Sequence, residues 1–138
     1  MTEEVAERTA DVEAEIQAEA AERRDLRDMT TWTTDPIDAQ DFDDALSVAE
    51  RDDEFVLWVH IADVTHYVTP DTTMWDEALR RANTVYLPGY TVHMLPPTLA
   101  ETVCSLVPQA DRLAHTVEMH LDKETLGYED IEIYKSLV

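Results

Sequence analysis

Residues 45–62 read Ala-Leu-Ser-Val-Ala-Glu-Arg-Asp-Asp-Glu-Phe-Val-Leu-Trp-Val-His-Ile-Ala, and this stretch indicates the fold. Two β-prone runs, residues 45–49 and 55–62, are separated by charged residues, which is the spacing of a β-hairpin. The second run is apolar on both strand faces, with Phe55, Leu57, Val59 and Ile61 on one face and Val56 and Trp58 on the other. We therefore expect this strand to be buried on both sides.

The segment before this hairpin changes character at Thr30. Residues 2–29 are rich in Glu, Ala and Arg, contain no Gly or Pro, and carry a thin apolar stripe through Val5, Val12, Ile16 and Leu26. This pattern predicts a helix that packs lightly on its neighbours. From Thr30 the chain is extended in character, and Pro36 ends any helix. We therefore divide the chain into an acidic helical segment, residues 1–29, and a domain of residues 30–138.

Downstream of the hairpin, the sequence predicts a helix followed by a loop. Thr72 or Thr73 can cap a helix over residues 74–82, and the acidic residues in its first turn suit the positive end of a helix. Residues 85–90 then predict a loop that carries aromatic side chains.

The last part of the chain predicts a further helix and a second hairpin. Thr98 with Glu101 forms a capping-box pattern before a helix that continues to residue 106. Residues 113–121 alternate in polarity, and a turn at Gly127 leads into residues 128–134. The order of these elements predicts an α+β fold, in which an N-terminal helix is followed by a mixed sheet with short helices.

The composition bounds the class of protein. The 138 residues include 31 Asp and Glu against 10 Lys and Arg, which gives a formal net charge of −21. Concentrated salt screens such repulsion, so we expect a halophilic protein. No apolar run approaches the roughly 20 residues of a membrane span, and we expect a cytoplasmic protein with no membrane partner. The single cysteine, Cys104, has apolar neighbours and is typical of a buried structural thiol.

The stretch Asp35-Pro36-Ile37-Asp38-Ala39-Gln40-Asp41-Phe42-Asp43-Asp44 holds five carboxylates in ten residues. Carboxylates this close repel one another unless a cation neutralises them, and oxygen ligands suit Mg²⁺, Mn²⁺ or Ca²⁺. The alternative is a solvated acidic loop on a chain that is acidic everywhere. A metal site is favoured because Pro36 stiffens the stretch, and we expect Ile37 and Phe42 to anchor it.

A calcium EF-hand is disfavoured for this stretch. A loop that starts at Asp41 would need Gly at its sixth position and Glu at its twelfth, and the chain has Leu46 and Asp52 there. What remains is a carboxylate cluster for Mg²⁺-type ions. Nucleases use this arrangement to hold two cations about 4 Å apart across a phosphate.

Residues 34–45, Thr-Asp-Pro-Ile-Asp-Ala-Gln-Asp-Phe-Asp-Asp-Ala, resemble the signature of the ribonuclease II and ribonuclease R family. Further stretches resemble that family's catalytic RNB domain in the same order, at residues 59–68, 84–88, 94–96 and 99–114. The resemblance runs from about residue 33 to the C-terminus. Several ordered blocks are more specific than one acidic motif.

This resemblance implies a hydrolytic exoribonuclease that degrades single-stranded RNA from its 3′ end and releases nucleoside 5′-monophosphates with Mg²⁺ or Mn²⁺. Asp35, Asp41, Asp43 and Asp44 match the family's active-site aspartates. In that assignment Asp35, Asp41 and Asp44 bind metal, whereas Asp43 positions the second metal or the attacking water. Tyr86 matches the aromatic residue that packs on a base near the RNA 3′ end.

Other titratable residues favour structural roles. His60 and His66 lie near a strand end, and packing with loop hydrogen bonds is favoured over a pair of metal ligands. Asp63 either supports the metal ligands or caps its own turn, and the sequence does not choose between the two. Three further histidines show no ligand spacing: His93, His115 and His120.

Two features depart from the family. Its catalytic domain continues beyond the position of Val138 and supplies further active-site residues, and oligonucleotide-binding barrels flank it. We therefore expect this chain to be the N-terminal portion of an RNB domain that requires its remainder or a partner chain. The alternative is a non-catalytic acidic module, derived from the same fold, that binds or assembles with other proteins.

Overall fold

A computed structural model describes residues 12–37 and 39–138, so residues 2–11 of the expected N-terminal helix lie outside the described part. Residues 12–19 are helical. The elements that follow are η1 (Ala20–Glu22), β1 (Arg24–Asp25), β2 (Asp44–Glu50), β3 (Glu54–Ala62), α2 (Val64–Tyr67), α3 (Thr73–Arg81), β4 (Val85–Leu87), β5 (Tyr90–Val92), η2 (Thr98–Val103), β6 (Leu113–Asp122) and β7 (Tyr128–Leu137).

The N-terminal helix ends earlier than residue 29, so that prediction was wrong. The 3₁₀ turn η1 closes it at Glu22, and β1 then pairs in parallel with the end of β7. Pairing with β7 therefore gives hydrogen-bond partners to the backbone N–H and C=O groups of β1, which a longer helix would have to pair within itself. Ile16 of the helix is 1% exposed and packs against Leu113 and Leu137, which fixes the segment to the sheet.

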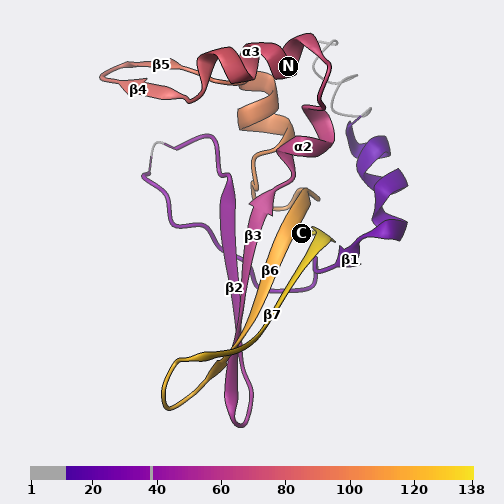
Figure 1. The fold of residues 1–138 in the computed structure, drawn as a ribbon, viewed down its shortest axis with the longest axis vertical. Coiled ribbons are helices and arrows are strands. Elements are labelled where there is room, and N and C mark those ends of the chain that lie inside the picture. Colours follow the sequence, from indigo (N-terminus) through magenta and orange to yellow (C-terminus); the bar gives the residue numbers. More distant parts are fainter. Residues whose placement is uncertain (1–11, 38) are drawn as a thin grey trace.

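Both predicted hairpins are confirmed and belong to one sheet. β2 pairs with β3, and β6 pairs with β7, each in antiparallel register, and the strand order is β1-β7-β6-β3-β2. The two long hairpins extend away from the end of the molecule that carries α2, α3 and the small β4–β5 hairpin (Figure 1). The architecture is α+β, as the sequence predicts.

The two faces of β3 differ in burial. Val56 and Trp58 are buried as expected, at 0% and 7% exposure, but Ile61 on the opposite face is 44% exposed. The expectation of a strand buried on both sides was therefore wrong for one face. That face continues into exposed Val48 of β2 and Ile133 of β7, and it lies at the molecular surface.

Four strands share a buried chain of polar side chains. His60 Nε2 lies 3.0 Å from Ser47 Oγ, and His60 Nδ1 lies 2.9 Å from Thr116 Oγ1, which in turn lies 2.6 Å from Ser136 Oγ. All four side chains are fully buried. Burial lowers the pKa of His60 to about 4, so the imidazole is neutral and structural, as predicted.

The segment after β3 confirms one predicted helix and corrects the predicted loop. Thr72 caps α3 by accepting a hydrogen bond from the backbone N–H of Trp75, at 3.2 Å. Residues 85–90, expected as a loop, instead contribute to the β4–β5 hairpin. Gly89, with φ of 75°, supplies the left-handed backbone that the tight turn requires.

The capping-box prediction at Thr98 was wrong. Thr98 is already inside η2, a π-helical turn whose N-cap is Pro97, and no side chain caps that end. The helix also ends at Val103, not at residue 106. Arg112 Nη2 donates a hydrogen bond to the carbonyl of Thr102, at 2.8 Å, near the end of this turn. Such contacts from distant residues do not follow from local sequence.

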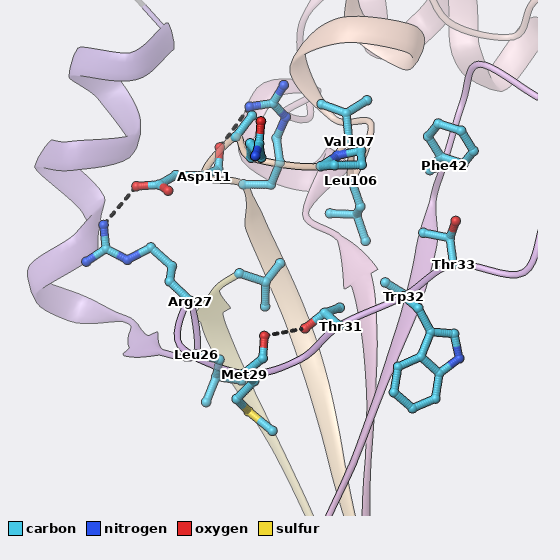
Figure 2. Close-up of a pocket in the computed structure, with 16 residues that line it drawn as sticks. Leu26, Arg27, Met29, Thr31, Trp32, Thr33, Phe42, Leu106, Val107 and Asp111 are labelled. Carbon is cyan, nitrogen blue, oxygen red and sulfur yellow. Dashed lines mark hydrogen bonds and ion pairs between the residues drawn. The ribbon is translucent and has the colours of Figure 1, made fainter.

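A cavity of about 510 Å³ lies where the segment around Trp32 passes the residues that lead into β6 (Figure 2). Phe42, Leu106 and Val107 line it, and an ion pair between Arg27 and Asp111, at 2.8 Å, lies at its other side. The cavity is mostly apolar.

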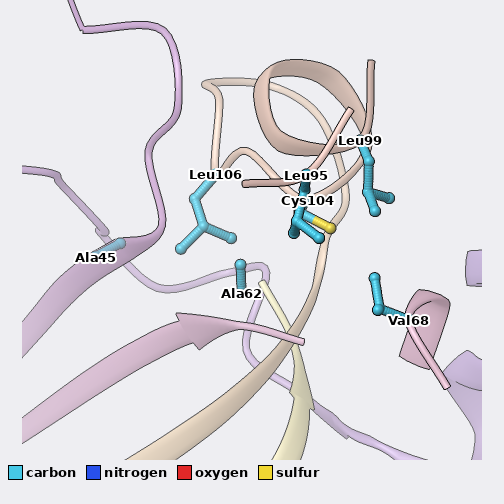
Figure 3. Close-up of a cluster of buried hydrophobic side chains, with 7 residues drawn as sticks. All are labelled: Ala45, Ala62, Val68, Leu95, Leu99, Cys104 and Leu106. Atoms are coloured by element: carbon cyan, nitrogen blue, oxygen red, sulfur yellow. The ribbon is translucent and has the colours of Figure 1, made fainter. Parts of the chain in front are cut away.

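The main hydrophobic core lies between the helical end of the sheet and η2 (Figure 3). Its buried members come from β2, β3, the C-terminal end of α2 and the segments around η2: Ala45, Ala62, Val68, Leu95, Leu99, Cys104 and Leu106. Burial raises the pKa of the Cys104 thiol to about 12, which confirms an unreactive structural thiol. Among the described residues, no helix has the length and apolarity needed to cross a membrane.

Candidate active site

The acidic stretch, residues 35–44, is a loop that the core segment after η2 holds in place. Ser105 is 1% exposed; its hydroxyl accepts a hydrogen bond from the backbone N–H of Phe42 at 3.0 Å and donates to the carbonyl of Gln40 at 3.1 Å. The backbone N–H of Leu106 donates to the Phe42 carbonyl at 2.8 Å. These contacts fix the backbone on either side of Asp41.

The two apolar residues of this loop behave differently. Phe42 packs against the main core and anchors the loop, as predicted. Ile37 is fully exposed at 106% and anchors nothing, so that expectation was wrong. The turn that carries Ile37 is closed by a hydrogen bond from the backbone N–H of Ala39 to the Pro36 carbonyl, at 2.9 Å, and this turn directs Ile37 into solvent.

The carboxylates of this loop act on one another. Burial, together with the charges of Asp44, Asp41 and Asp35, raises the pKa of Asp43. A backbone hydrogen bond from the Ala62 N–H to the Asp43 carbonyl, at 2.9 Å, holds this position beside the end of β3. The loop therefore concentrates negative charge at a position that the sheet keeps fixed.

A second cavity, of about 590 Å³, brings most of the predicted site together. Asp35, Asp41, Asp43 and Tyr86 all line it. Asp44, the first residue of β2, does not line it. The 510 Å³ cavity near Trp32 is lined by none of these aspartates, so the predicted site residues gather at the 590 Å³ cavity.

Tyr86 connects the two walls of this cavity. Its hydroxyl donates a hydrogen bond to Asp41 Oδ2 at 2.5 Å, which joins the β4–β5 hairpin to the acidic loop. That hydrogen bond to a carboxylate raises the pKa of Tyr86 to about 12. Tyr86 as a whole remains 65% exposed, so the side chain is accessible to a ligand.

The donor atoms of the loop suit a hard divalent cation in their chemistry. They are carboxylate oxygens, and Asp35 Oδ2 is buried with no hydrogen-bond partner in the described part of the structure. A buried carboxylate oxygen without a donor is costly, and a cation is a partner that would satisfy it. However, within residues 12–37 and 39–138 no three His, Cys, Asp or Glu side chains converge closely enough to form a metal-binding group.

Three residues of the cavity were missed by the sequence analysis: Tyr90, His93 and Glu101. His93 Nε2 lies 3.3 Å from Glu101 Oε1, and the His93 carbonyl accepts a hydrogen bond from Arg81 Nη1 at 2.8 Å. His93 and Glu101 are far from the acidic loop in sequence, so only the fold brings them to it. The sequence does carry a signal for Tyr90, because residues 83–92 around it contain no charged residue in a strongly acidic chain.

Asp63 lies outside this cavity and has a structural role. It caps α2 by accepting a hydrogen bond from the backbone N–H of His66 at 3.1 Å. It also accepts a hydrogen bond from Arg23 at 2.7 Å, and His115 lies 3.2 Å away. Of the two readings that the sequence left open for Asp63, the structure supports the capping role. His66, whose Nε2 lies 2.9 Å from Glu15 Oε1, joins the N-terminal helix rather than a ligand set.

Comparison with known proteins matches most of the chain, including the acidic loop and the residues that line the 590 Å³ cavity, to one family. A family model described as the RNB domain matches residues 23–138. Ribonuclease R from Chlamydia muridarum is 45% identical over 118 residues, which cover 84% of this chain and 17% of that protein. The chain therefore spans about a sixth of the length of this curated relative.

Solved structures share the fold. The structure of Mycoplasma genitalium RNase R in complex with ribose-methylated single-stranded RNA matches with a TM-score of 0.83 at 34% identity, covering 91% of this chain and 21% of that chain. Yeast Ssd1, described as a pseudonuclease, matches with a TM-score of 0.76 at 21% identity, covering 87% of this chain and 15% of that chain. The second likeness concerns the fold alone.

Proposed function

Because the chain belongs to the RNB family, we propose that it carries the acidic part of the active site of a metal-dependent 3′-to-5′ exoribonuclease. The proposed reaction is the hydrolysis of single-stranded RNA to nucleoside 5′-monophosphates. The observation that carries this proposal is the cavity in which Asp35, Asp41 and Asp43 face Tyr86.

The aspartates of the loop divide the chemistry between them. Asp35, Asp41 and Asp44 are the residues that would hold Mg²⁺ or Mn²⁺, and Asp43 positions the second metal or the attacking water. When bound, such an ion lowers the pKa of a water ligand and neutralises charge on the phosphate. The protein's own contribution is to keep the carboxylates fixed, which the hydrogen bonds of Ser105 to the loop backbone achieve.

Tyr86 orients the RNA. Its ring is exposed while its hydroxyl is tied to Asp41, so a base that packs on the ring is held at a defined place beside the carboxylates. Stacking on a tyrosine face suits every base, which is what a sequence-independent nuclease requires.

On this proposal, RNA hydrolysis requires more than this chain. The Chlamydia muridarum relative is about five times as long as this chain, and a site this acidic needs a positively charged side chain to meet the phosphate. We propose that the remainder of the RNB domain, in the same polypeptide or a partner chain, supplies it.

A second candidate function is a non-catalytic module that binds or assembles with proteins. The fold is shared with a protein described as a pseudonuclease, and the net charge of −21 opposes the approach of a polyanion. Divalent-metal binding separates the two candidates, because only the nuclease needs a cation at the aspartates.

The test has two parts, both in about 2 M KCl, where surface charge is screened. Calorimetric titration with Mn²⁺ compares the wild-type chain with Asp35→Asn, Asp44→Asn and the control Asp52→Asn, whose carboxylate lies in the turn between β2 and β3. We expect binding in the wild type and the control, and its loss in the other two variants.

The second part follows a 5′-labelled single-stranded RNA with Mn²⁺ and with the wild-type or Asp43→Asn chain, each within a protein that also contains the remainder of the RNB domain. Stepwise shortening from the 3′ end, slowed at least about 100-fold in Asp43→Asn, would support the nuclease. A folded wild-type chain that neither binds Mn²⁺ nor shortens RNA would refute the proposal and favour the non-catalytic module.

A further inference from the structure

The β4–β5 hairpin and its flanking residues form a stretch without charge in a strongly acidic chain. Residues 83–92, Asn-Thr-Val-Tyr-Leu-Pro-Gly-Tyr-Thr-Val, contain no Asp, Glu, Lys, Arg or His, whereas 41 of the chain's 138 residues are Asp, Glu, Lys or Arg. We call residues 83–92 the neutral hairpin. Its large apolar side chains are exposed, including Leu87 at 52% and Tyr90 at 68%. Such exposure indicates a contact surface rather than a core.

The register of the neutral hairpin separates its two tyrosines. Tyr86 is paired with Thr91, and Leu87 is paired with Tyr90. Directly opposite residues of an antiparallel pair share a face, and neighbours along a strand point to opposite faces. Tyr86 and Tyr90 therefore lie on opposite faces of the hairpin, although both line the 590 Å³ cavity.

The position of the neutral hairpin suits a polyanion that the rest of the surface repels. The other wall of the cavity is the acidic loop, where phosphate groups meet repulsion. The neutral hairpin itself carries no carboxylate that would repel an RNA strand. Its exposed tyrosine rings offer stacking, which depends less on surface charge and on salt than ion pairs do.

We propose that Tyr90 is a second base-contacting residue, whose ring packs on a nucleobase of single-stranded RNA other than the base that Tyr86 contacts. The inference rests on the proposed function, since it requires RNA in this cavity. The neutral hairpin then lies between two bases of the bound strand, with one tyrosine on each side. Tyr90 is a positioning residue, because it holds the strand and does not meet the scissile phosphate.

The experiment places the fluorescent base 2-aminopurine at each of the last four positions of a single-stranded RNA, in about 2 M KCl, where ion pairs contribute little. Stacking on a tyrosine changes the fluorescence at the position concerned. The proteins are the wild type, Tyr86→Leu, Tyr90→Leu, Tyr90→Phe and the control Tyr128→Leu. Tyr128 is also an exposed tyrosine, at 72%, but it lies in β7 and does not line the cavity.

We expect Tyr90→Leu to weaken RNA binding at least about 5-fold and to remove the fluorescence change at one position, because one stacked base contributes about 1 to 3 kcal/mol. Tyr86→Leu should remove the change at a different position. Tyr90→Phe keeps the ring and should behave as the wild type, as should Tyr128→Leu. Circular dichroism confirms that each variant is folded.

Three outcomes overturn the inference, and they differ in what they say of the proposed function. If the wild type binds RNA and Tyr90→Leu binds it equally well, only the role of Tyr90 fails. If Tyr86→Leu and Tyr90→Leu affect the same position, the two-base arrangement fails. A wild-type chain that is folded but binds no RNA overturns both the inference and the proposed function.

Discussion

The buried ion pair between Arg23 and Asp63 gives a sharp test of what holds the N-terminal segment to the sheet. The two side chains are 0% and 1% exposed, and Arg23 Nη2 lies 2.7 Å from Asp63 Oδ2. Burial opposes ionisation of Asp63, but hydrogen bonds from Arg23 and Thr65 keep its pKa below the usual value. Asp63→Asn removes the negative charge and leaves a buried guanidinium.

Removing one partner of a buried ion pair costs about 3 to 5 kcal/mol, because the remaining charge is unpaired. Glu19, whose Oε2 lies 3.3 Å from Arg23 Nη2, still offers partial compensation. We therefore expect Asp63→Asn to lower the free energy of unfolding by about 3 kcal/mol, the lower end of that range. Asparagine preserves the shape of the side chain and can still accept the cap hydrogen bond from His66.

The assay is urea unfolding followed by circular dichroism in about 2 M KCl. The matched control is Asp111→Asn, because Asp111 forms an ion pair of 2.8 Å with Arg27 in which both side chains are more than a third exposed. An exposed pair contributes only about 0 to 1 kcal/mol. Arg23→Leu in the Asp63→Asn background should recover at least about 1 kcal/mol, because it removes the unpaired charge. Equal losses of less than about 1 kcal/mol in Asp63→Asn and Asp111→Asn would refute the reasoning.

Three further predictions follow from buried polar groups. Because burial lowers the pKa of His60 from 6.5 to about 4, the unfolded chain binds more protons than the folded chain between those pH values. The free energy of unfolding should therefore fall by about 3 kcal/mol as the pH drops through this window. Urea unfolding at several pH values measures this, and His60→Gln should lose that part of the pH dependence. Cys104, with a pKa raised to about 12, should react with a thiol reagent at pH 8 only as fast as the protein unfolds; a fast reaction of the folded chain would contradict its burial. Ser105→Ala removes the hydrogen bonds to the backbone of Phe42 and Gln40. It should lower the free energy of unfolding in urea by about 1 to 3 kcal/mol and weaken Mn²⁺ binding in calorimetry. Unchanged Mn²⁺ affinity would show that the loop does not depend on this anchor.

Local signals in the sequence were enough for the two long hairpins. β-Prone runs joined by polar turns are properties of neighbouring residues, so β2–β3 and β6–β7 follow from the pattern alone. The strand order β1-β7-β6-β3-β2 does not, because β1 has only two residues and pairs with a strand more than 100 residues away. A pairing of that kind depends on the packing of Ile16 against Leu113, which no local pattern reveals.

The candidate site likewise contains some residues that local sequence reveals and others that only the fold brings together. The acidic loop was visible because its carboxylates are adjacent in sequence, and Tyr86 was found through the family resemblance. His93 and Glu101 reach the cavity only because the fold brings the neutral hairpin and η2 to the loop. Ile37 was misjudged because apolarity alone does not show where a residue points; the Pro36–Ala39 turn does.

Neutral contacts hold the acidic loop in place, so substitutions of its carboxylates and substitutions of its anchors test two different properties. Hydrogen bonds with the Ser105 hydroxyl and from the backbone N–H groups of Leu106 and Ala62 anchor its backbone, and none of these is an ion pair. Salt therefore does not loosen these contacts, and an Asp→Asn change within the loop alters charge while leaving them intact. Ser105→Ala does the reverse, since it keeps every carboxylate and removes part of the anchor. If metal binding falls in Asp35→Asn and also in Ser105→Ala, the site requires both the charge and its fixed position. If only Asp35→Asn has an effect, charge density alone is sufficient.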